Sequence, residues 1–188
     1  NSPDSKFICG GEESYGFMKG DFVRDKDAIT SSLLACEIVA EAKSNKKSFF
    51  SILVDLYVKF GLFHDKLVSI EKKGMRGAEQ IKNLIDGFRN QPPNLLDGSE
   101  IIIIEDYLTS KRYDVRLKQL TKIDLPKSNV LVLVSSDGTR VAIRPSGTEP
   151  KIKFYFSVNM KLTKRENYRI TKTILENKIK RILTEFDI

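Results

Sequence analysis

The sequence predicts an α+β fold, in which an antiparallel sheet with helices on one face follows the strand-helix-helix tail of an α/β domain. Three observations lead to this class. Apolar residues recur at helical spacing before residue 61 and again near the end of the chain. Apolar and polar residues alternate over residues 139–144 and 152–158, as is typical of strands. The dipeptide Asp137-Gly138 is a strong hairpin signal between two strands.

Residues 1–63 are expected to form the strand-helix-helix tail. A strand over residues 6–9 leads into a glycine-containing loop. A helix capped by Asp25 or Asp27 follows, because either carboxylate can accept backbone hydrogen bonds at a helix start. A second helix begins after residue 48 and ends at Gly61. The first helix carries an apolar stripe formed by Ile29, Leu33, Cys36, Val39 and Ala40.

Residues 64–188 are expected to form a second domain. A strand over residues 64–72 precedes a helix that Pro92 and Pro93 terminate. Strands are expected over residues 101–104 and 130–134 and in the two alternating segments, with a polar connection through residue 127. The inward face of the first helix is expected to contain Met75, Ala78, Ile81, Leu84, Ile85 and Phe88. The final helix is expected to bury Tyr168, Ile174, Leu175, Ile179, Ile182 and Leu183.

Composition excludes several classes of protein. The 188 residues are 40% hydrophobic and 30% charged, which is globular composition, and no apolar run approaches the ~18 residues of a membrane helix. A single histidine, His64, argues against a Ser-His-Asp triad and excludes a multi-histidine zinc site. Two cysteines, Cys9 and Cys36, cannot form a disulfide framework and indicate a reducing compartment, so we expect a cytoplasmic protein without a membrane partner.

The net charge of +7 comes mainly from the end of the chain. Residues 151–188 carry ten basic and four acidic side chains. We interpret them as the solvated face of the final helix, and no aromatic residues interleave with them to stack on bases. No nucleic-acid partner is therefore expected. Two alternatives remain open: a basic nucleic-acid-binding module, and a non-enzymatic interaction domain whose loops are structural.

The segment from Arg144 to Pro150, between the alternating strands, has the composition of a phosphate-binding loop. Its two prolines stiffen the ends, and Gly147 permits close approach of a ligand and unusual backbone angles. Ser146 and Thr148 offer hydroxyl donors, and Arg144 can direct a guanidinium fork at phosphate oxygens. The alternative is an ordinary Pro/Gly/Ser turn between strands.

The segment around Glu12, Glu13 and Ser14 lies where the first strand enters a loop. Carboxylates and a hydroxyl suit recognition of vicinal sugar hydroxyls, and two acids are also compatible with acid/base chemistry. The alternative is a pair of exposed charges beside a glycine turn. Lys26, near the start of the first helix, can reach an anionic substrate.

The two loops together resemble those of the α-D-phosphohexomutase family, which includes phosphoglucomutase and phosphomannomutase. The resemblance rests on GGEESYGF at residues 10–17, VRDKDA at 23–28 and RPSGTEPKIKFYF at 144–156. It spans nearly the whole chain and is strongest to the bacterial phosphoglucomutase branch. Members of the family have four domains, and this chain resembles the tail of the third (residues 1–63) and all of the fourth (residues 64–188). The first residue is Asn1, and we interpret the chain as a piece of a longer protein.

The resemblance implies roles for particular residues. Glu12 and Ser14 match contacts to the hydroxyls of the sugar, and Lys26 matches a basic position of the phosphoglucomutase branch. The loop that holds the non-reacting phosphate is matched by Arg144, Ser146, Gly147 and Thr148. Many members have a histidine in the sugar loop, but residues 15–17 are Tyr-Gly-Phe here, so no histidine base is expected there.

The resemblance also implies what the chain lacks. Neither the phosphoserine loop, Thr-x-Ser-His-Asn-Pro, nor the magnesium loop, Asp-Gly-Asp-x-Asp-Arg, occurs in the sequence. The implied full-length enzyme interconverts hexose 1-phosphate and hexose 6-phosphate, with glucose as the preferred hexose and mannose as the alternative. It uses Mg²⁺, a phosphoserine and a bisphosphorylated sugar, with glucose 1,6-bisphosphate as activator. This chain is expected to supply sugar and phosphate contacts, to contain no catalytic residue or metal ligand, and to pack against the N-terminal domains of its own protein.

Overall fold

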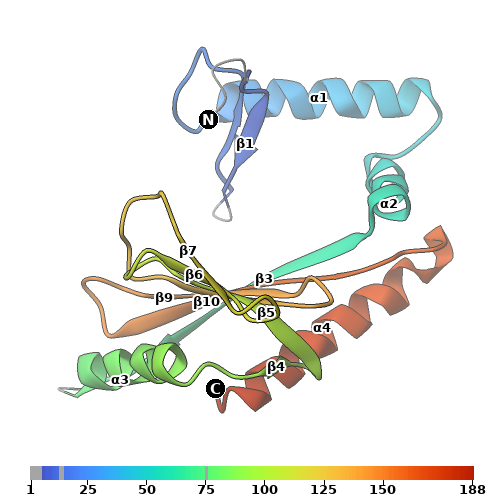
Figure 1. Ribbon diagram of the computed structural model, residues 1–188. Coiled ribbons are helices and arrows are strands. Elements are labelled where there is room, and N and C mark those ends of the chain that lie inside the picture. The colour runs from blue at the N-terminus through green and yellow to red at the C-terminus, as the bar shows by residue number, and fades with distance from the viewer. Residues whose placement is uncertain (1–5, 13–14, 75) are drawn as a thin grey trace. The chain divides into compact units, whose positions relative to one another are not determined.

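The computed structural model describes residues 6–12, 15–74 and 76–188 (Figure 1). It divides into two compact units, residues 1–56 and 57–188. The unit boundary falls inside a helix, so the division expected at residues 63 and 64 stays a prediction. Among the described residues, no helix is both long and apolar enough to cross a membrane.

The first unit begins with a hairpin and continues into two helices. β1 (Cys9–Gly11) pairs antiparallel with β2 (Phe17–Lys19). The predicted strand over residues 6–9 is therefore wrong in position, and the prediction did not include β2. α1 (Ala28–Ser44) is capped by Asp27, whose carboxylate accepts hydrogen bonds from the backbone of Ile29 and Thr30. A further bond from the Thr30 hydroxyl helps to lower the pKa of Asp27. α2 (Phe49–Phe60) ends before Gly61, as expected.

The apolar stripe of α1 is present but uncovered. The exposed fraction of Ile29 is 82% and that of Leu33 is 61%, and Cys36 is also exposed. β2 packs against the start of the helix, where the Phe17 carbonyl accepts hydrogen bonds from Asp27 N and Ser31 Oγ. The predicted stripe is therefore confirmed as a feature of α1, and Ile29, Leu33 and Cys36 are exposed in it.

The second unit is built on one antiparallel sheet with the strand order β3-β10-β9-β8-β5-β6-β7, and β4 pairs with β5 outside this path. The strands are β3 (Leu62–Glu71), β4 (Leu95–Leu96), β5 (Ser99–Asp106), β6 (Lys111–Asp114), β7 (Gln119–Lys122), β8 (Leu131–Ser135), β9 (Arg140–Pro145) and β10 (Lys151–Met160). The helical elements are α3 (Gly77–Asn90), the 3₁₀ turn η1 (Arg165–Asn167) and α4 (Tyr168–Glu185).

One face of the sheet carries the core. Along β10, Ile152, Phe154, Phe156 and Val158 are buried, while the intervening residues lie on the opposite face. α3 and α4 both pack against the buried face, as Figure 1 shows. Phe154 meets Phe88 of α3 edge-on, with the ring centroids 5.9 Å apart. An antiparallel sheet with helices on one face confirms the predicted α+β class.

Three expectations for the second unit are wrong in detail. Ala78, expected on the inward face of α3, is exposed. The segment through residue 127, expected to be a polar connection, contains the hairpin of β6 and β7, whose side chains are largely exposed. In α4, Leu175 and Ile179 are buried as expected, but Ile174 is 40% exposed. Lys178 is buried instead, because its ammonium group reaches an acidic turn of the sheet. Met75, expected in the inward face of α3, lies outside the described residues.

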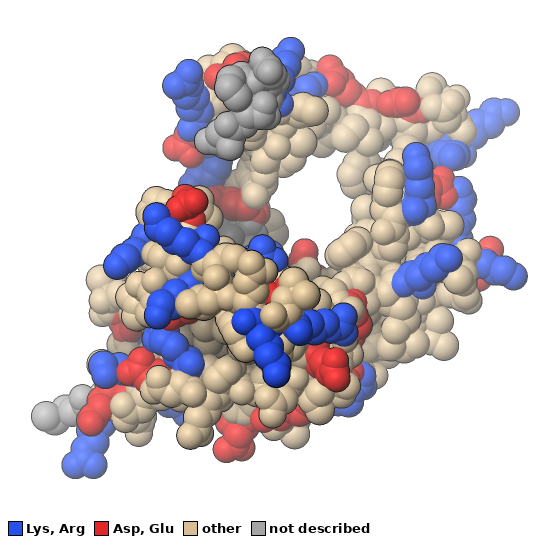
Figure 2. Space-filling model, viewed as in Figure 1, with Lys and Arg blue, Asp and Glu red and all other residues tan. Residues whose placement is uncertain are grey.

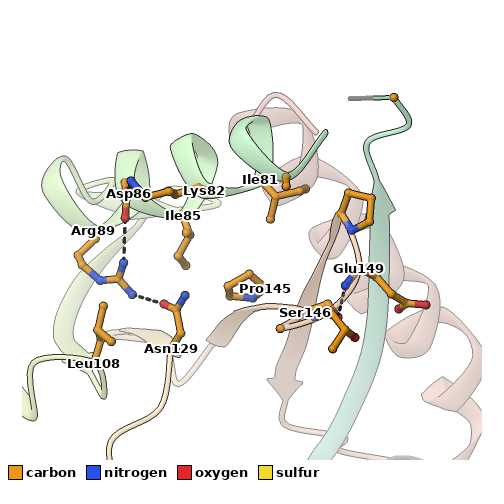
Figure 3. A pocket seen from close by; sticks show the side chains of 15 residues that line it. Ile81, Lys82, Ile85, Asp86, Arg89, Leu108, Asn129, Pro145, Ser146 and Glu149 are labelled. Atoms are coloured by element: carbon orange, nitrogen blue, oxygen red, sulfur yellow. Dashed lines mark hydrogen bonds and ion pairs between the residues drawn. The ribbon is translucent and has the colours of Figure 1, made fainter. Parts of the chain in front are cut away.

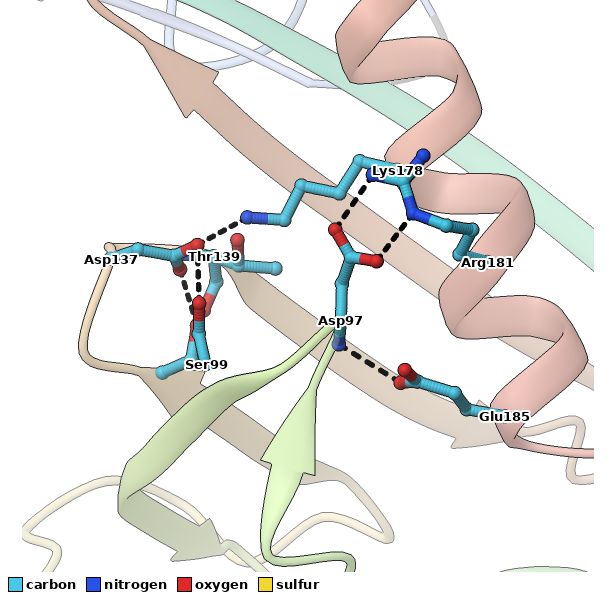
Figure 4. A network of polar contacts seen from close by, with 8 residues as sticks. Asp97, Ser99, Asp137, Thr139, Lys178, Arg181 and Glu185 are labelled. Carbon is cyan, nitrogen blue, oxygen red and sulfur yellow. Dashed lines mark hydrogen bonds and ion pairs between the residues drawn. The ribbon is translucent and has the colours of Figure 1, made fainter.

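Polar contacts attach α4 to two turns of the sheet (Figure 4). Lys178 donates a hydrogen bond to Asp137, in the turn between β8 and β9. Arg181 forms a two-pronged ion pair with Asp97, in the turn between β4 and β5, with Nη2 to Oδ2 at 2.8 Å. These two basic residues of α4 are therefore paired with carboxylates in the turns of the sheet. On the face drawn in Figure 2, basic and acidic side chains are interspersed.

Candidate functional site

The segment from Pro145 to Pro150 joins β9 to β10 and lies at the end of the sheet. Val141 and Ile143 of β9 are buried in the core, so Arg144 lies on the opposite, uncovered face. Arg144 is exposed and, among the described residues, no carboxylate forms an ion pair with it. Its guanidinium group is therefore available to an anion at this end of the sheet.

A second cation faces Arg144 across the strand pair. Lys153 of β10 is its direct partner in the register, and Ser69 of β3 is the next residue across the sheet. Directly opposed residues have Cβ atoms about 5 Å apart, and like charges in this arrangement repel. Lys153 has no acidic partner in the part of the chain that the structure describes. An anion between the two side chains would relieve the repulsion.

Within the loop, the Ser146 hydroxyl accepts hydrogen bonds from Thr148 N at 3.4 Å and from Glu149 N at 3.3 Å. Ser146 N donates to the Lys151 carbonyl at 2.8 Å and closes the loop at its base. The serine therefore organises the loop and keeps its own proton available to a ligand. Thr148 is exposed, and its hydroxyl has the same freedom.

Gly147 lies at the exposed tip of this loop. Its φ is not among the positive values, so the expectation of unusual backbone angles is not met. A Cβ atom placed there would meet nothing within 4 Å. The space around the glycine backbone is open, and a ligand can approach it closely.

The connection between β3 and α3 supports the loop from behind. Lys72 N donates a hydrogen bond to the Pro150 carbonyl at 2.9 Å. A Cβ atom at Gly77 would lie 1.9 Å from the Lys72 carbonyl oxygen and 3.1 Å from Pro150 Cβ. Only a glycine permits this approach, so the start of α3 fixes the end of the loop.

In the first unit, Glu12 and Lys26 meet beside the β1–β2 hairpin. Lys26 Nζ lies 3.5 Å from Glu12 Oε1, and both side chains line a pocket of about 280 Å³. Gly16 makes the contact possible, because a Cβ atom there would lie 2.4 Å from both Glu12 Oε1 and Lys26 Cδ. Tyr15 has a φ of 67° and a fully exposed side chain. Ser14 and Glu13, which the sequence analysis also singled out, lie outside the described residues.

The structure thus groups the candidate residues in two sets. It brings Glu12 and Lys26 together in the first unit, and Arg144, Ser146, Gly147 and Thr148 together in the second. Sequence reasoning missed Lys153, although the alternation over residues 152–158 already places it on the open face. Its pairing with Arg144 depends on the register across the loop, which the sequence pattern does not give.

No group of three or more histidine, cysteine or carboxylate side chains that could hold a metal ion occurs among the described residues. The acidic pair near the start of α1 is already engaged. Asp27 caps the helix, and Asp25 lies 4.0 Å from Lys26 Nζ. The residues described here therefore do not fit a magnesium site.

The fold and the loops define an α+β protein in which an anion-accessible hairpin loop lies at the end of the antiparallel sheet. Comparison with family models matches residues 3–60 to the α/β/α domain III, and residues 109–174 to the C-terminal domain, of phosphoglucomutase/phosphomannomutase. The chain belongs to the phosphoglucomutase/phosphomannomutase family.

Individual relatives agree with this assignment. A phosphoglucomutase of Staphylococcus epidermidis is 42% identical over 158 residues, which are 84% of this chain and 29% of the relative. A phosphoglucomutase of Staphylococcus aureus is 41% identical over 147 residues, which are 78% of this chain and 26% of the relative. The open form of pp63/parafusin from Paramecium has a similar fold, with a TM-score of 0.61 and 23% identity over 94% of this chain and 29% of that one. The chain spans less than a third of the length of these relatives.

Proposed function

We propose that the whole protein of which this chain forms part is a phosphohexomutase that interconverts hexose 1-phosphate and hexose 6-phosphate. Membership of the phosphoglucomutase/phosphomannomutase family supports this activity. The relatives named phosphoglucomutase support glucose phosphates as the preferred substrates. We place residues 1–63 in its third domain, residues 64–188 in its fourth, and the protein in the cytoplasm.

The main support for the proposal is the segment from Arg144 to Pro150, called the phosphate loop below. Arg144 and Lys153 form a pair of adjacent cations on an open face, beside the hydroxyl groups of Ser146 and Thr148. This combination suits a doubly charged phosphate, because a guanidinium group supplies paired donors and an ammonium group adds charge. In the proposed reaction, these residues hold the phosphate that does not react and so fix the orientation of the sugar.

The first unit supplies the sugar contacts in this proposal. Glu12, with Ser14, accepts and donates hydrogen bonds to sugar hydroxyls, since an ionised carboxylate can accept two such bonds. The Lys26 ammonium group, 3.5 Å from Glu12, orients that carboxylate and can contact the substrate itself. Neither group needs to exchange a proton in this role.

Other parts of the whole protein carry the group-transfer chemistry. We assign to them the phosphoserine and the ligands of Mg²⁺, which supplies charge stabilisation when bound. The same proposal includes glucose 1,6-bisphosphate as the intermediate and activator. This chain binds and orients, and alone it should not turn substrate over.

A ligand titration tests the phosphate loop directly. Glucose 6-phosphate added to the ¹⁵N-labelled chain should shift the amide signals of residues 146–148 at millimolar concentration, whereas glucose should not. The variant Arg144→Ala should bind about tenfold more weakly, the value of one charged hydrogen bond.

Arg140→Ala is the matched control. Arg140 lies on the same face of the same strand, but it faces Glu105 at 3.5 Å, so its loss should leave the affinity unchanged. Equal weakening in both variants would indicate a general charge effect. That result, or an equal response to glucose, would refute the assignment.

A further inference from the structure

A pocket of about 460 Å³ lies behind the phosphate loop, on the helix-covered side of the sheet (Figure 3). Its walls are α3 and the loop segment from Pro145 to Pro150. Arg144 does not line it, because that side chain lies on the opposite face of β9. The volume falls in the range of about 300–1,000 Å³ that is usual for small-molecule sites.

The base of the pocket is apolar. Ile81 and Ile85 of α3 are 4% and 1% exposed, and they face Pro145 across the space. Leu108 lies at one end, where it is partly exposed. These side chains offer a flat apolar ligand contact on both of its faces.

The polar end of the pocket is electrically balanced. Arg89 contacts Asp106 and Asp86, each at 3.2 Å, and Lys82 contacts Asp86 at 3.1 Å. Two cations thus face two carboxylates. A charged ligand would find no unpaired opposite charge at this end of the pocket. It would lose its hydration without gaining a new ion pair.

Hydrogen-bond donors nevertheless remain at this end. Arg89 Nη2 donates to Asn129 Oδ1 at 2.7 Å, so the amide group of Asn129 is held with its NH₂ free to donate to a ligand (Figure 3). A guanidinium group has five N–H donors, and the three hydrogen bonds of Arg89 occupy three of them. The remaining donors call for an acceptor such as a carbonyl oxygen.

We propose that this pocket binds an uncharged, flat, apolar molecule that carries a carbonyl acceptor, such as an aromatic amide. The ring lies against Ile81, Ile85 and Pro145, and the carbonyl accepts hydrogen bonds from Asn129 and Arg89. Because Pro145 and Ser146 form part of the wall, the ligand contacts the phosphate loop from the side opposite Arg144. The site goes beyond the proposed function, since its ligand binds to α3 and Asn129 and not to Arg144, although Ser146, Gly147 and Thr148 line both sites.

An isosteric pair of probes tests the proposal: indole-3-carboxamide, which is neutral, and indole-3-carboxylate, which is anionic. Added to the ¹⁵N-labelled chain, the carboxamide should shift the amide signals of Ile85, Arg89 and Ser146. The carboxylate should bind at least about tenfold more weakly, because the polar end offers it no net positive charge.

Three variants locate the site. Ala78→Phe should abolish binding, because Ala78 is exposed on the α3 wall and a larger side chain fills the pocket without entering the core. Asn129→Ala, in an exposed loop, should weaken binding about fivefold and covers the case in which Ala78→Phe fails to fold. Arg144→Ala should leave carboxamide binding unchanged.

Each contrary result would overturn the proposal. Equal or tighter binding of the carboxylate would contradict the charge argument, and full binding by Ala78→Phe or Asn129→Ala would place the ligand elsewhere. Loss of carboxamide binding in Arg144→Ala would mean that the probe occupies the phosphate site. Failure here would leave the proposed function standing, because glucose 6-phosphate binding is tested by its dependence on Arg144, which does not line this pocket.

Discussion

Gly77 controls how closely α3 can approach the phosphate loop. The missing side chain leaves room for the Lys72 carbonyl, which would otherwise lie 1.9 Å from a Cβ atom. Because the backbone oxygen cannot rotate away as a side chain could, any larger residue must move the start of α3 or the end of β3. Pro150, hydrogen-bonded to Lys72 N, would move with them.

Gly77→Ala should therefore destabilise the chain by about 1–3 kcal/mol, as overpacking does. Urea unfolding measures this, and the amide signals of residues 146–150 should shift in the folded variant. Gly87→Ala is the control, since Gly87 is in the same helix with nothing within 4 Å of its Cβ position. It should stabilise by about 0.5–1 kcal/mol. A Gly77→Ala variant as stable as the parent would show that this close approach does not constrain the loop.

At the scale of elements, α4 is held to the sheet by charge as well as by its apolar face. Lys178 is buried on the inner side of the helix, and its ammonium group meets Asp137 in the β8–β9 turn (Figure 4). Burial alone would raise the pKa of Asp137. Hydrogen bonds from Lys178, Ser135, Thr139 N and Ser99 outweigh it and hold the pKa well below its usual range.

Lys178→Met should destabilise the attachment of α4 by about 1–3 kcal/mol at neutral pH, because Asp137 loses its charged partner. The cost is below that of a fully buried pair, since Asp137 is partly exposed. Urea unfolding, followed through the amide signals of α4, measures the difference. Lys172→Met removes an exposed pair with Glu176 and should change stability by less than about 0.5 kcal/mol.

Acidification should reduce the difference in the free energy of unfolding between the parent chain and Lys178→Met. The Asp137 carboxyl has a lower pKa in the folded chain than in the unfolded chain, where it is about 4. Its stabilising contribution is therefore complete above that value and is lost as the pH falls below it. The same unfolding experiment at pH 7, 5 and 3 should show a constant difference between the first two and a smaller one at pH 3. A difference independent of pH would contradict the assigned partner.

The elements differ in how far the sequence specifies them. The alternation over residues 139–144 and 152–158 predicted β9, β10 and the position of the loop between them, because one buried face imposes a period of two. The hairpin of β6 and β7 was missed, because its strands are mostly exposed. Polar residues are tolerated on both of their faces, so the sequence shows no alternation of polar and apolar residues there. The burial of Lys178 could not be predicted, because it depends on a turn 41 residues away in the chain.

At the scale of the whole molecule, the uncovered stripe of α1 calls for a partner surface. Ile29 and Leu33 expose large apolar side chains on one side of a helix, which is costly in water. The chain spans less than a third of the length of its relatives. We propose that in the full-length enzyme the rest of its own polypeptide covers this stripe.

Leu33→Gln should affect stability differently in the full-length enzyme and in this chain alone. In the full-length enzyme it should reduce stability by about 2 kcal/mol, the value of a buried leucine side chain, whereas in this chain alone it should change stability by less than about 0.5 kcal/mol. Leu117→Gln, at a position that is 71% exposed in the β6–β7 hairpin, should have little effect in either context. Equal effects of Leu33→Gln in the two contexts, measured by thermal unfolding, would rule out the cover.

The most direct test of the central claim is the steady-state kinetics of Arg144→Ala in the full-length enzyme, with glucose 1-phosphate as substrate. If Arg144 holds the non-reacting phosphate, kcat/KM should fall about 10–100-fold, chiefly through a higher KM, because a charged hydrogen bond to phosphate contributes roughly 1.5–3 kcal/mol. Arg140→Ala, on the same face of β9 but opposite Glu105, should retain the parent kinetics. Unchanged kinetics in Arg144→Ala would contradict the account.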